Sequence, residues 1–322
     1  MAVYVNTNYS ALQGQRYLGN VQNSLTTTYQ RLSSGMRINS AKDDAAGLQI
    51  ADRLTSQING LNQGNRNASD GIALAQTAES AMDEISGMMQ KIRTLAVQAN
   101  NGTNTIDDKK ALSKEATALA TEINRIVKQT TFAGKTILNG QQDNSIAPPT
   151  GANATQNKGK AQAISLQVGS NKGDTISFDL QNMIFSKLAE ANKIQGTGNN
   201  AAFDKIYKDH TTAIGKGADD AVNINFSVAG APESLIAAMD IMIGAVDAER
   251  ANLGALQNRL ESSIRNQSNV AANEADARSR IRDADFAEES ANLSQQSIIQ
   301  QAAASMLMQA NTRPQLGLSL LG

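Results

Sequence analysis

Residues 45–99 read AAGLQIADRLTSQINGLNQGNRNASDGIALAQTAESAMDEISGMMQKIRTLAVQA, with no proline in the run. Apolar residues recur there at steps of three and four, which places them on one side of an α-helix. About 55 residues at a rise of about 1.5 Å each form a rod on the order of 80 Å long. Such a rod cannot bury its apolar stripe against itself, so the sequence predicts partner helices. The stripe consists of Ala51, Leu54, Ile58, Leu61, Ala68, Ile72, Ala75, Ala78, Met82, Ile85, Met89, Ile92 and Ala96.

The composition excludes several classes of protein. The chain has 322 residues and a formal net charge of −1, so it lacks the basic excess of a protein that binds nucleic acid or an anionic membrane surface. It contains no cysteine, which excludes disulfides and thiolate metal sites. No apolar run is long enough to predict a transmembrane helix, and the N-terminal residues lack the pattern of a cleaved signal peptide. We expect no cofactor.

The N-terminal residues 1–34 predict a helix with a weak apolar seam. The seam has strict three-and-four spacing, but Gly14 and Thr28 occupy two of its positions. Burying one leucine contributes roughly 1.5–3 kcal/mol, whereas ordering each residue costs on the order of 1–2 kcal/mol. The segment is therefore expected to fold only against a partner.

A break follows at Gly35, and residues 37–42 are expected to form a non-helical connector. Ser40 is the expected N-cap of the long helix. Asp43 and Asp44 lie at the positively polarised start of that helix, and no EF-hand spacing surrounds them. We therefore assign these two carboxylates to the helix start and not to cation binding.

A second, shorter helix follows an Asn-Asn-Gly turn at residues 100–102. Thr105 is its expected N-cap. The tight turn predicts an antiparallel return along the first rod. The apolar stripe of this helix is Leu112, Ala116, Leu119, Ile123 and Ile126.

Alternating apolar residues predict a β-hairpin in the middle of the chain. Residues 164–168 and 176–180 alternate, and a glycine-containing turn separates them. The composition becomes irregular from residue 181 to about 220, which predicts a small outlying lobe. One more short strand is predicted by Ile224, Phe226 and Val228.

A long helix is expected to resume near Pro232, a residue suited to a helix start. A charged break at residues 278–285 separates it from a last helix at about 286–311. The seam of the first of these helices is Met239, Met242, Val246, Glu249, Leu253, Leu256, Leu260, Ser263, Gln267 and Val270. The last helix is apolar on several sides, so neighbours must enclose it. Its apolar residues are Leu293, Ile298, Ile299, Ala302, Ala303, Met306 and Leu307.

The predicted fold is mainly α, with long antiparallel coiled-coil or helical-bundle rods built from both chain ends, a β-hairpin and a small irregular outer segment. Both ends are helical and partner-seeking, so the simplest arrangement brings them together. The predicted parts are residues 1–42 (inner-core helix and connector), 43–182 (first part of the outer rod, two helices plus the hairpin), 183–222 (reduced variable surface segment), 223–280 (second part of the outer rod) and 281–322 (C-terminal inner-core helix).

Several motifs in this order resemble bacterial flagellin, the subunit of the flagellar filament. The N-terminal match is RLSSGMRINSAKDDAAGLQIADRL at residues 31–54, followed by NRNASDGIALAQTAESAMDEI, KIRTLAVQANNGT, TTFAGKTIL and the hairpin LQVGSNKGDTISFDL. The C-terminal match is GALQNRLES, ARSRIRDADFAEES and the closing QANTRPQLGLSLLG. The resemblance covers residues 1–180 and 222–322.

The resemblance implies an extracellular helical homopolymer whose terminal helices form an inner coiled coil and whose rods form the surrounding shell. It also implies unfolded export through the flagellar type III apparatus, an export chaperone on the C-terminal helix, and contacts with hook-associated and cap proteins. The implied inner-core assembly residues are Leu18, Val21, Leu25, Leu32, Phe286, Leu293, Ile298, Met306 and Leu307. The implied outer-rod seam is Leu54, Ile58, Leu61, Ile72, Met82, Ile85, Leu119, Ile123, Val246, Leu253, Leu256 and Leu260.

The resemblance further implies an exposed patch that a vertebrate Toll-like receptor recognises and that contacts the adjacent subunit. The matching residues are Gln90, Lys91, Ile92, Arg93, Leu95 and Glu115. Lys91 departs from the arginine common in the family, and lysine keeps the charge but loses the planar fork. We therefore expect weakened recognition. The alternative is a purely structural, solvated face.

Two other functions remain as alternatives. A hook–filament junction protein shares terminal helices with flagellin, although the full SAKDDAAGLQIA run and the QLGLSLLG ending favour flagellin. An enzyme could instead be grafted onto the outer segment. His210 is the only histidine, and the segment offers neither a metal motif nor a nucleophile–base pair, so we expect no enzymatic activity.

Overall fold

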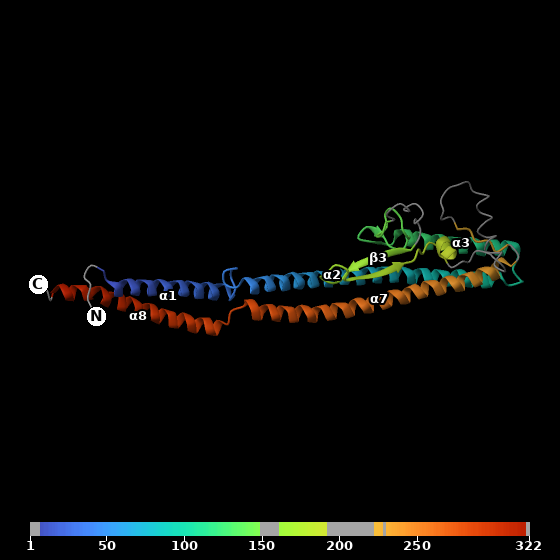
Figure 1. Ribbon diagram of the computed structural model, residues 1–322. Coiled ribbons are helices and arrows are strands. Elements are labelled where there is room, and N and C mark those ends of the chain that lie inside the picture. The colour runs from blue at the N-terminus through green and yellow to red at the C-terminus, as the bar shows by residue number, and fades with distance from the viewer. Residues whose placement is uncertain (1–6, 149–160, 192–221, 228–229, 320–322) are drawn as a thin grey trace. The chain divides into compact units, whose positions relative to one another are not determined.

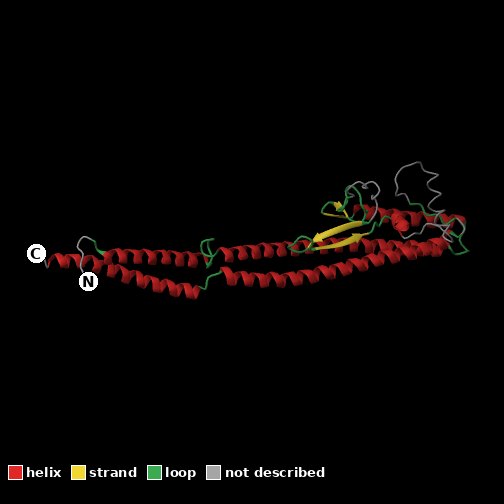
Figure 2. Cartoon of the chain, viewed as in Figure 1, coloured by secondary structure: helices red, strands yellow, loops and turns green. Residues whose placement is uncertain are grey.

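The computed structural model describes residues 7–148, 161–191, 222–227 and 230–319 (Figures 1 and 2). The chain divides into two compact units, Met1–Asn59 with Asn269–Gly322, and Gly60–Ser268. This division differs from the boundaries expected at 42/43 and 280/281. It falls within helices α2 (Ala45–Ala99) and α7 (Ala231–Arg282), which run across the division without a break.

In the first unit, α1 (Tyr9–Ser34) and α8 (Phe286–Ser319) pack side by side and antiparallel (Figure 1). Asn8 caps α1, because its side-chain oxygen accepts from the backbone N–H of Ala11 at 3.1 Å. Gly35 ends α1 in the left-handed region, with φ +70°. The predicted N-terminal helix and its break at Gly35 are confirmed, while residues 1–6 lie outside the described part.

The predicted N-cap of α2 is wrong by four residues. Asp44 occupies that position, since its Oδ1 accepts from the backbone N–H of Gly47 at 2.9 Å. Ser40 instead donates its backbone N–H and its hydroxyl to Asp43 Oδ2, at 2.9 and 3.1 Å. The backbone N–H of Ser40 is the main reason why the pKa of Asp43 lies below its usual value. Both carboxylates therefore stabilise the start of the helix, as predicted.

In the second unit, α2 and α7 share an apolar core with α3 (Ile106–Gln129). Thr105 caps α3 in a capping box with Asp108, as predicted. Of the predicted outer-rod seam, Ile58, Leu61, Met82, Ile85, Ile123, Val246, Leu253, Leu256 and Leu260 are buried, and Leu54, Ile72 and Leu119 are half-buried. Val270, the last seam position predicted on α7, is 37% exposed, and its neighbour Ala271 is buried instead.

The predicted hairpin consists of β3 (Gln162–Gln167) and β4 (Thr175–Leu180), with Ile164 opposite Phe178 in an antiparallel register. A smaller antiparallel hairpin joins β1 (Thr131–Phe132) and β2 (Lys135–Thr136) directly after α3.

The larger hairpin packs against glycine positions of α2. A Cβ at Gly64 would overlap the carbonyl oxygen of Val168 and lie 2.7 Å from its carbonyl carbon. A Cβ at Gly60 would lie 2.6 Å from Cβ of Ser170, and one at Gly71 would collide with the Leu166 side chain. These three positions let the hairpin backbone approach the helix closely.

The structure corrects the start of the irregular outer segment. Residues 183–191 were expected to begin an outlying lobe, but Met183, Ile184 and Leu188 are buried in the core and α5 (Phe185–Ala191) is helical. The backbone N–H of Phe185 donates to Asn124 Oδ1 of α3 at 2.9 Å. Seven helical residues are too few to show a clear period, which is why the pattern missed them.

The strand expected at 224–228 does not form over the described residues 222–227. Ile224 and Phe226 are buried, but their backbone N–H groups donate to side chains of α3. Ile224 donates to Thr117 Oγ1 at 3.0 Å, and Phe226 donates to Ser113 Oγ at 2.9 Å. Val228 and the rest of the outer segment, residues 192–221, lie outside the described residues.

The last two helices are longer than predicted. Helix α7 begins at Ala231, next to Pro232, and runs to Arg282, so the break before α8 shrinks to residues 283–285. Helix α8 begins at Phe286 as expected and continues to Ser319.

Candidate assembly surface

The contact between α1 and α8 is thin for a pair of long helices. Among the described residues of these helices, Val21 and Ala303 are the buried apolar ones, at 9% and 5% exposure. The predicted inner-core residues Leu18, Leu25, Leu32, Leu293 and Leu307 are half-buried. Gly14 permits one close approach, because a Cβ there would lie 3.2 Å from Cδ1 of Leu307. The two helices contact each other along the predicted seam, but the leucines of the seam remain partly exposed to solvent.

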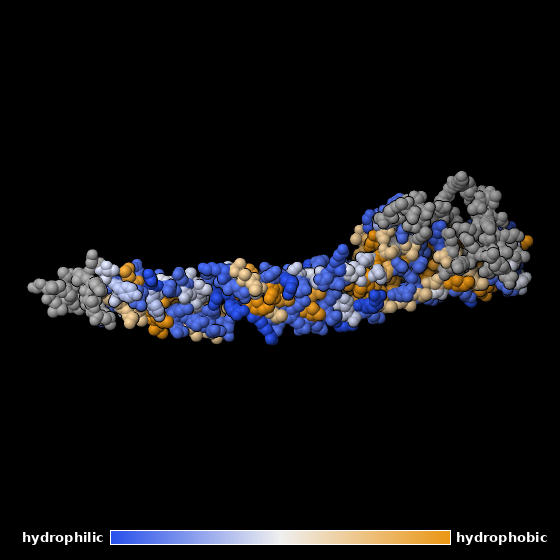
Figure 3. Space-filling view, in the orientation of Figure 1, coloured by the Kyte–Doolittle hydropathy of each residue, from blue (hydrophilic) through white to orange (hydrophobic). Residues whose placement is uncertain are grey.

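The other predicted inner-core residues remain on the surface. Phe286, Ile298 and Met306 are 66%, 66% and 70% exposed. Further exposed apolar side chains, which were not among the predicted residues, are Tyr9, Leu12, Tyr17, Tyr29 and Met308. Figure 3 shows apolar side chains interrupting the hydrophilic surface of this helix pair. We call these eight exposed residues the terminal-helix surface. Exposed large apolar side chains gathered on one pair of helices indicate an interaction surface.

The sequence contains a signal for part of this surface. Four of the five tyrosines of the chain lie in its first 29 residues, at positions 4, 9, 17 and 29. They do not follow one helical stripe, so a search for periodicity passes over them. Only 3% of the chain's residues are aromatic, so this clustering of tyrosines near the N-terminus is the feature of the composition that indicates a surface there.

Two grooves flank the α1–α8 pair. The first is lined by Ser10, Gln13, Gly14, Tyr17, Ala303, Met306, Gln309 and Ala310. The second is lined by Thr7, Asn8, Ala11, Leu12, Gln15, Leu18, Leu307 and Asn311. The α1 residues of each set recur at helical spacing, and the two sets lie on different faces of α1. The pair therefore presents two unlike surfaces. Contacts between unlike surfaces of identical subunits give open helical polymers when they do not close.

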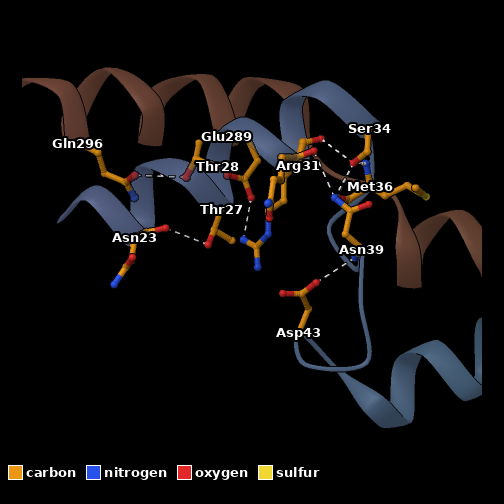
Figure 4. A network of polar contacts seen from close by, with 11 residues as sticks. Asn23, Thr27, Thr28, Arg31, Ser34, Met36, Asn39, Asp43, Glu289 and Gln296 are labelled. Carbon is orange, nitrogen blue, oxygen red and sulfur yellow. Dashed lines mark hydrogen bonds and ion pairs between the residues drawn. The ribbon is translucent and has the colours of Figure 1, made fainter. Parts of the chain in front are cut away.

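Polar contacts between the two helices are few and lie mostly near their break (Figure 4). Arg31 donates from Nη1 to Glu289 Oε1 at 2.9 Å, with side-chain exposures of 31% and 9%. Thr28 donates its hydroxyl to Gln296 Oε1 at 3.3 Å. At the far end, Asn8 donates from Nδ2 to the backbone carbonyl of Ala310 at 2.8 Å.

A paired junction lies where both helices are interrupted. Met36 and Asp283 form an antiparallel bridge. The backbone N–H of Arg37 donates to the carbonyl of Arg282 at 2.7 Å, and the N–H of Ala284 donates to the carbonyl of Gly35 at 3.0 Å. The connector after α1 is therefore tied to the segment before α8 within one chain.

The residues predicted for receptor recognition do not all lie on the surface. Gln90, Lys91 and Glu115 are exposed, and Leu95 is half-buried. Ile92 is fully buried, so its inclusion in an exposed patch is wrong. It continues the buried α2 stripe, and its side chain is not available to a partner of the folded unit. Arg93 forms an ion pair with Asp240 of α7, which raises the pKa of the guanidinium.

Neither a candidate metal site nor a membrane-spanning helix is found in the described residues. They contain no group of three or more His, Cys, Asp or Glu side chains that could hold a metal ion. Within the same ranges, none of the helices has the length and apolar character needed to cross a membrane. His210 lies outside the described part of the chain.

The N-terminal helical region of bacterial flagellin matches residues 5–143, and the C-terminal helical region of that family matches residues 236–321. The chain belongs to the bacterial flagellin family. It is similar over its full length to flagellin D of Vibrio anguillarum, with 38% identity across 383 aligned positions and complete coverage of both chains. Flagellin B of Vibrio cholerae is 36% identical across 383 positions, again with complete coverage of both.

A solved structure shares the fold. A chain from Vibrio parahaemolyticus, assigned as a flagellar hook-associated protein, superposes with a TM-score of 0.53 and 14% identity. The match covers 75% of this flagellin and 100% of that chain. Identity this low shows the fold alone, whereas the full-length sequence relatives are flagellins. The hook-associated alternative is therefore not favoured, and this flagellin is a structural subunit of the bacterial flagellar filament, outside the cell.

Proposed function

We propose that this flagellin polymerises by burying its terminal-helix surface against the α1–α8 pairs of neighbouring subunits. The observation that supports the proposal is the exposure of Phe286, Ile298 and Met306 on a helix pair whose described apolar side chains are buried only at Val21 and Ala303. Sequence positions 290–312 carry no charged side chain. A neighbour can therefore cover residues 290–312 of α8 without desolvating a charge on that stretch.

The polymerisation assay uses Ile298→Asp, with Ile298→Met as the conservative control. Removing an apolar side chain that becomes buried, and burying a carboxylate in its place, costs more than about 1.4 kcal/mol, which is about tenfold in affinity. We expect Ile298→Asp to raise the critical concentration for sedimentable filaments at least tenfold. Ile298→Met should stay near the parent protein. Equal polymerisation of the parent and Ile298→Asp would contradict the proposal.

The same exposed surface supports the proposed events before assembly. We propose that the chain is exported unfolded through the flagellar type III apparatus, since the thin α1–α8 contact makes the chain ends easy to unfold. An export chaperone would cover the apolar side chains of α8, and hook-associated and cap proteins would contact the terminal helices. Loss of chaperone binding on changing Met306→Asp and Met308→Asp together, measured by calorimetry, tests the chaperone part.

We also propose that a vertebrate Toll-like receptor recognises the exposed residues Gln90, Lys91 and Glu115, together with Arg93 and Leu95. Ile92 supports this surface from beneath. Because lysine lacks the planar fork of arginine, we expect Lys91→Arg to increase receptor potency in a reporter-cell assay. Equal potency would count against a weakening by Lys91. No catalytic role is proposed for the chain.

A further inference from the structure

We propose that Arg31 and Glu289 of the same subunit form the pair that fixes the register of α1 against α8. This proposal deepens the proposed function and rests on it, because it concerns the helix pair that polymerises. Arg31–Glu289 is the ion pair that joins α1 to α8 among the described residues. Glu289 is largely buried, with 7% of its surface exposed, so its carboxylate depends on the guanidinium as its partner.

The apolar seam alone does not define one register. On α8, residues 302–308 are alanine, methionine and leucine except for Ser305, and α1 offers Gly14 and spaced leucines in return. A slip of one helical turn exchanges one small or flexible apolar side chain for another. Apolar positions of similar size tolerate such exchanges, whereas a single polar contact in a helix seam specifies register.

A slip of one turn removes the polar contacts together. Arg31 and Thr28 lie three residues apart on α1 and reach Glu289 and Gln296, seven residues apart on α8 (Figure 4). Displacing either helix leaves the buried carboxylate of Glu289 without its cation. A buried charge without a partner is strongly disfavoured, so the pair penalises every wrong register.

The junction indicates that the pair belongs to one chain. Gly35, four residues after Arg31, accepts from the backbone N–H of Ala284, five residues before Glu289. Arg37 also donates from its guanidinium to the carbonyl of Ile281 at 2.8 Å. These bonds hold the two partners of the ion pair at short range before a second subunit arrives. The junction brings the helices together, and Arg31–Glu289 selects the register.

Charge reversal tests the pair. Arg31→Glu and Glu289→Arg should each raise the critical concentration for filaments at least tenfold, and the double reversal should return it to within about threefold of the parent. The matched controls are Arg16→Glu, at an exposed position of α1, and Glu288→Arg, the exposed neighbour on α8. Controls should change the critical concentration less than threefold. Single reversals that equal their controls, or a double reversal without rescue, would overturn the proposal.

An equimolar mixture of the two single-reversal proteins separates contacts within one subunit from contacts between subunits. A pair within one chain leaves the mixture as impaired as its components. A mixture that polymerises like the parent would show that Arg31 meets Glu289 of another subunit, which overturns the within-chain assignment. Ile298→Asp distinguishes failure of the register proposal from failure of the polymerisation proposal. If this variant polymerises like the parent, polymerisation through the terminal-helix surface is refuted, whatever the charge reversals show.

A crosslink reports the register without relying on polymer yield. The chain has no cysteine, so Thr28→Cys with Gln296→Cys introduces the only two thiols. A short thiol-reactive crosslinker should join them within one chain, giving a product of monomer mass on a denaturing gel. Adding Arg31→Glu should lower this yield several-fold, while adding Arg16→Glu should not. A ladder of crosslinked chains, or a yield insensitive to Arg31→Glu, would contradict the proposal.

Discussion

Replacing Gly64 by alanine tests whether the β-hairpin needs a glycine on the surface of α2 against which it packs. Alanine in a helix interior gains about 1 kcal/mol over glycine. At Gly64 the added methyl group would overlap the Val168 carbonyl, so the hairpin or the helix must move. Overpacking of this kind costs about 1–3 kcal/mol. We therefore expect Gly64→Ala to be neutral to destabilising by about 2 kcal/mol, instead of stabilising.

Gly254→Ala is the matched control, because nothing lies within 4 Å of a Cβ built at that position of α7. It should stabilise its helix by up to about 1 kcal/mol. Relative to each other, the two variants should differ by about 1–3 kcal/mol, or about 5- to 150-fold.

The readout is amide hydrogen exchange of hairpin peptides such as the one containing Val168, whose N–H donates to the carbonyl of Asp174 at 2.9 Å. These amides should exchange faster in Gly64→Ala than in Gly254→Ala by that factor. Equal exchange in the two variants would refute the argument that the hairpin needs a helix surface without a side chain at residue 64.

Three further outcomes are expected. Asp44→Ala should destabilise the start of α2 by about 0.5–2 kcal/mol through loss of its N-cap, whereas Ser40→Ala should cost less; urea unfolding followed by circular dichroism measures both. Ser113→Ala should destabilise the second unit by about 1–3 kcal/mol, because the buried N–H of Phe226 loses its acceptor, while Thr117→Ser keeps a hydroxyl and should cost less. The Thr105 hydroxyl and backbone N–H hold the pKa of Asp108 below its usual 3.8, so the stabilisation from this carboxylate is complete above that value and is lost as the pH falls below it. A pH titration of helicity between pH 7 and pH 2 should show a smaller acid loss in Asp108→Asn, and identical curves would contradict the assignment.

Long elements of the fold follow from the sequence, and short ones do not. The α2 stripe repeats over so many turns that its buried face is unambiguous, and the hairpin alternates over two full strands. Helix α5 has only seven residues, and Ile224 and Phe226 resemble a strand although their partners are hydroxyl groups of α3. In the sequence Gly64 is a helix-weakening residue, and only the hairpin packed against it shows why a side chain is excluded there. Such features depend on contacts between segments far apart in the sequence.

The assembly surface was predicted in part for a related reason. Periodicity identifies Val21, Ile298 and Met306 as apolar helix positions but does not say which of them the subunit buries and which remain exposed. The isolated α1–α8 pair buries Val21 and leaves the other two on the surface. For Ile92, periodicity gave the right answer and the resemblance did not. The resemblance placed Ile92 in an exposed patch, whereas its position in the apolar stripe of α2 predicted burial.

Footprinting by hydroxyl radicals, followed by mass spectrometry, tests the polymerisation proposal most directly. Tyr17 and Ile298 should react readily in the free subunit, at 56% and 66% exposure, and should become several-fold less reactive in assembled filaments. Equal reactivity of these two residues in the free and the filamentous protein would contradict assembly through the terminal helices.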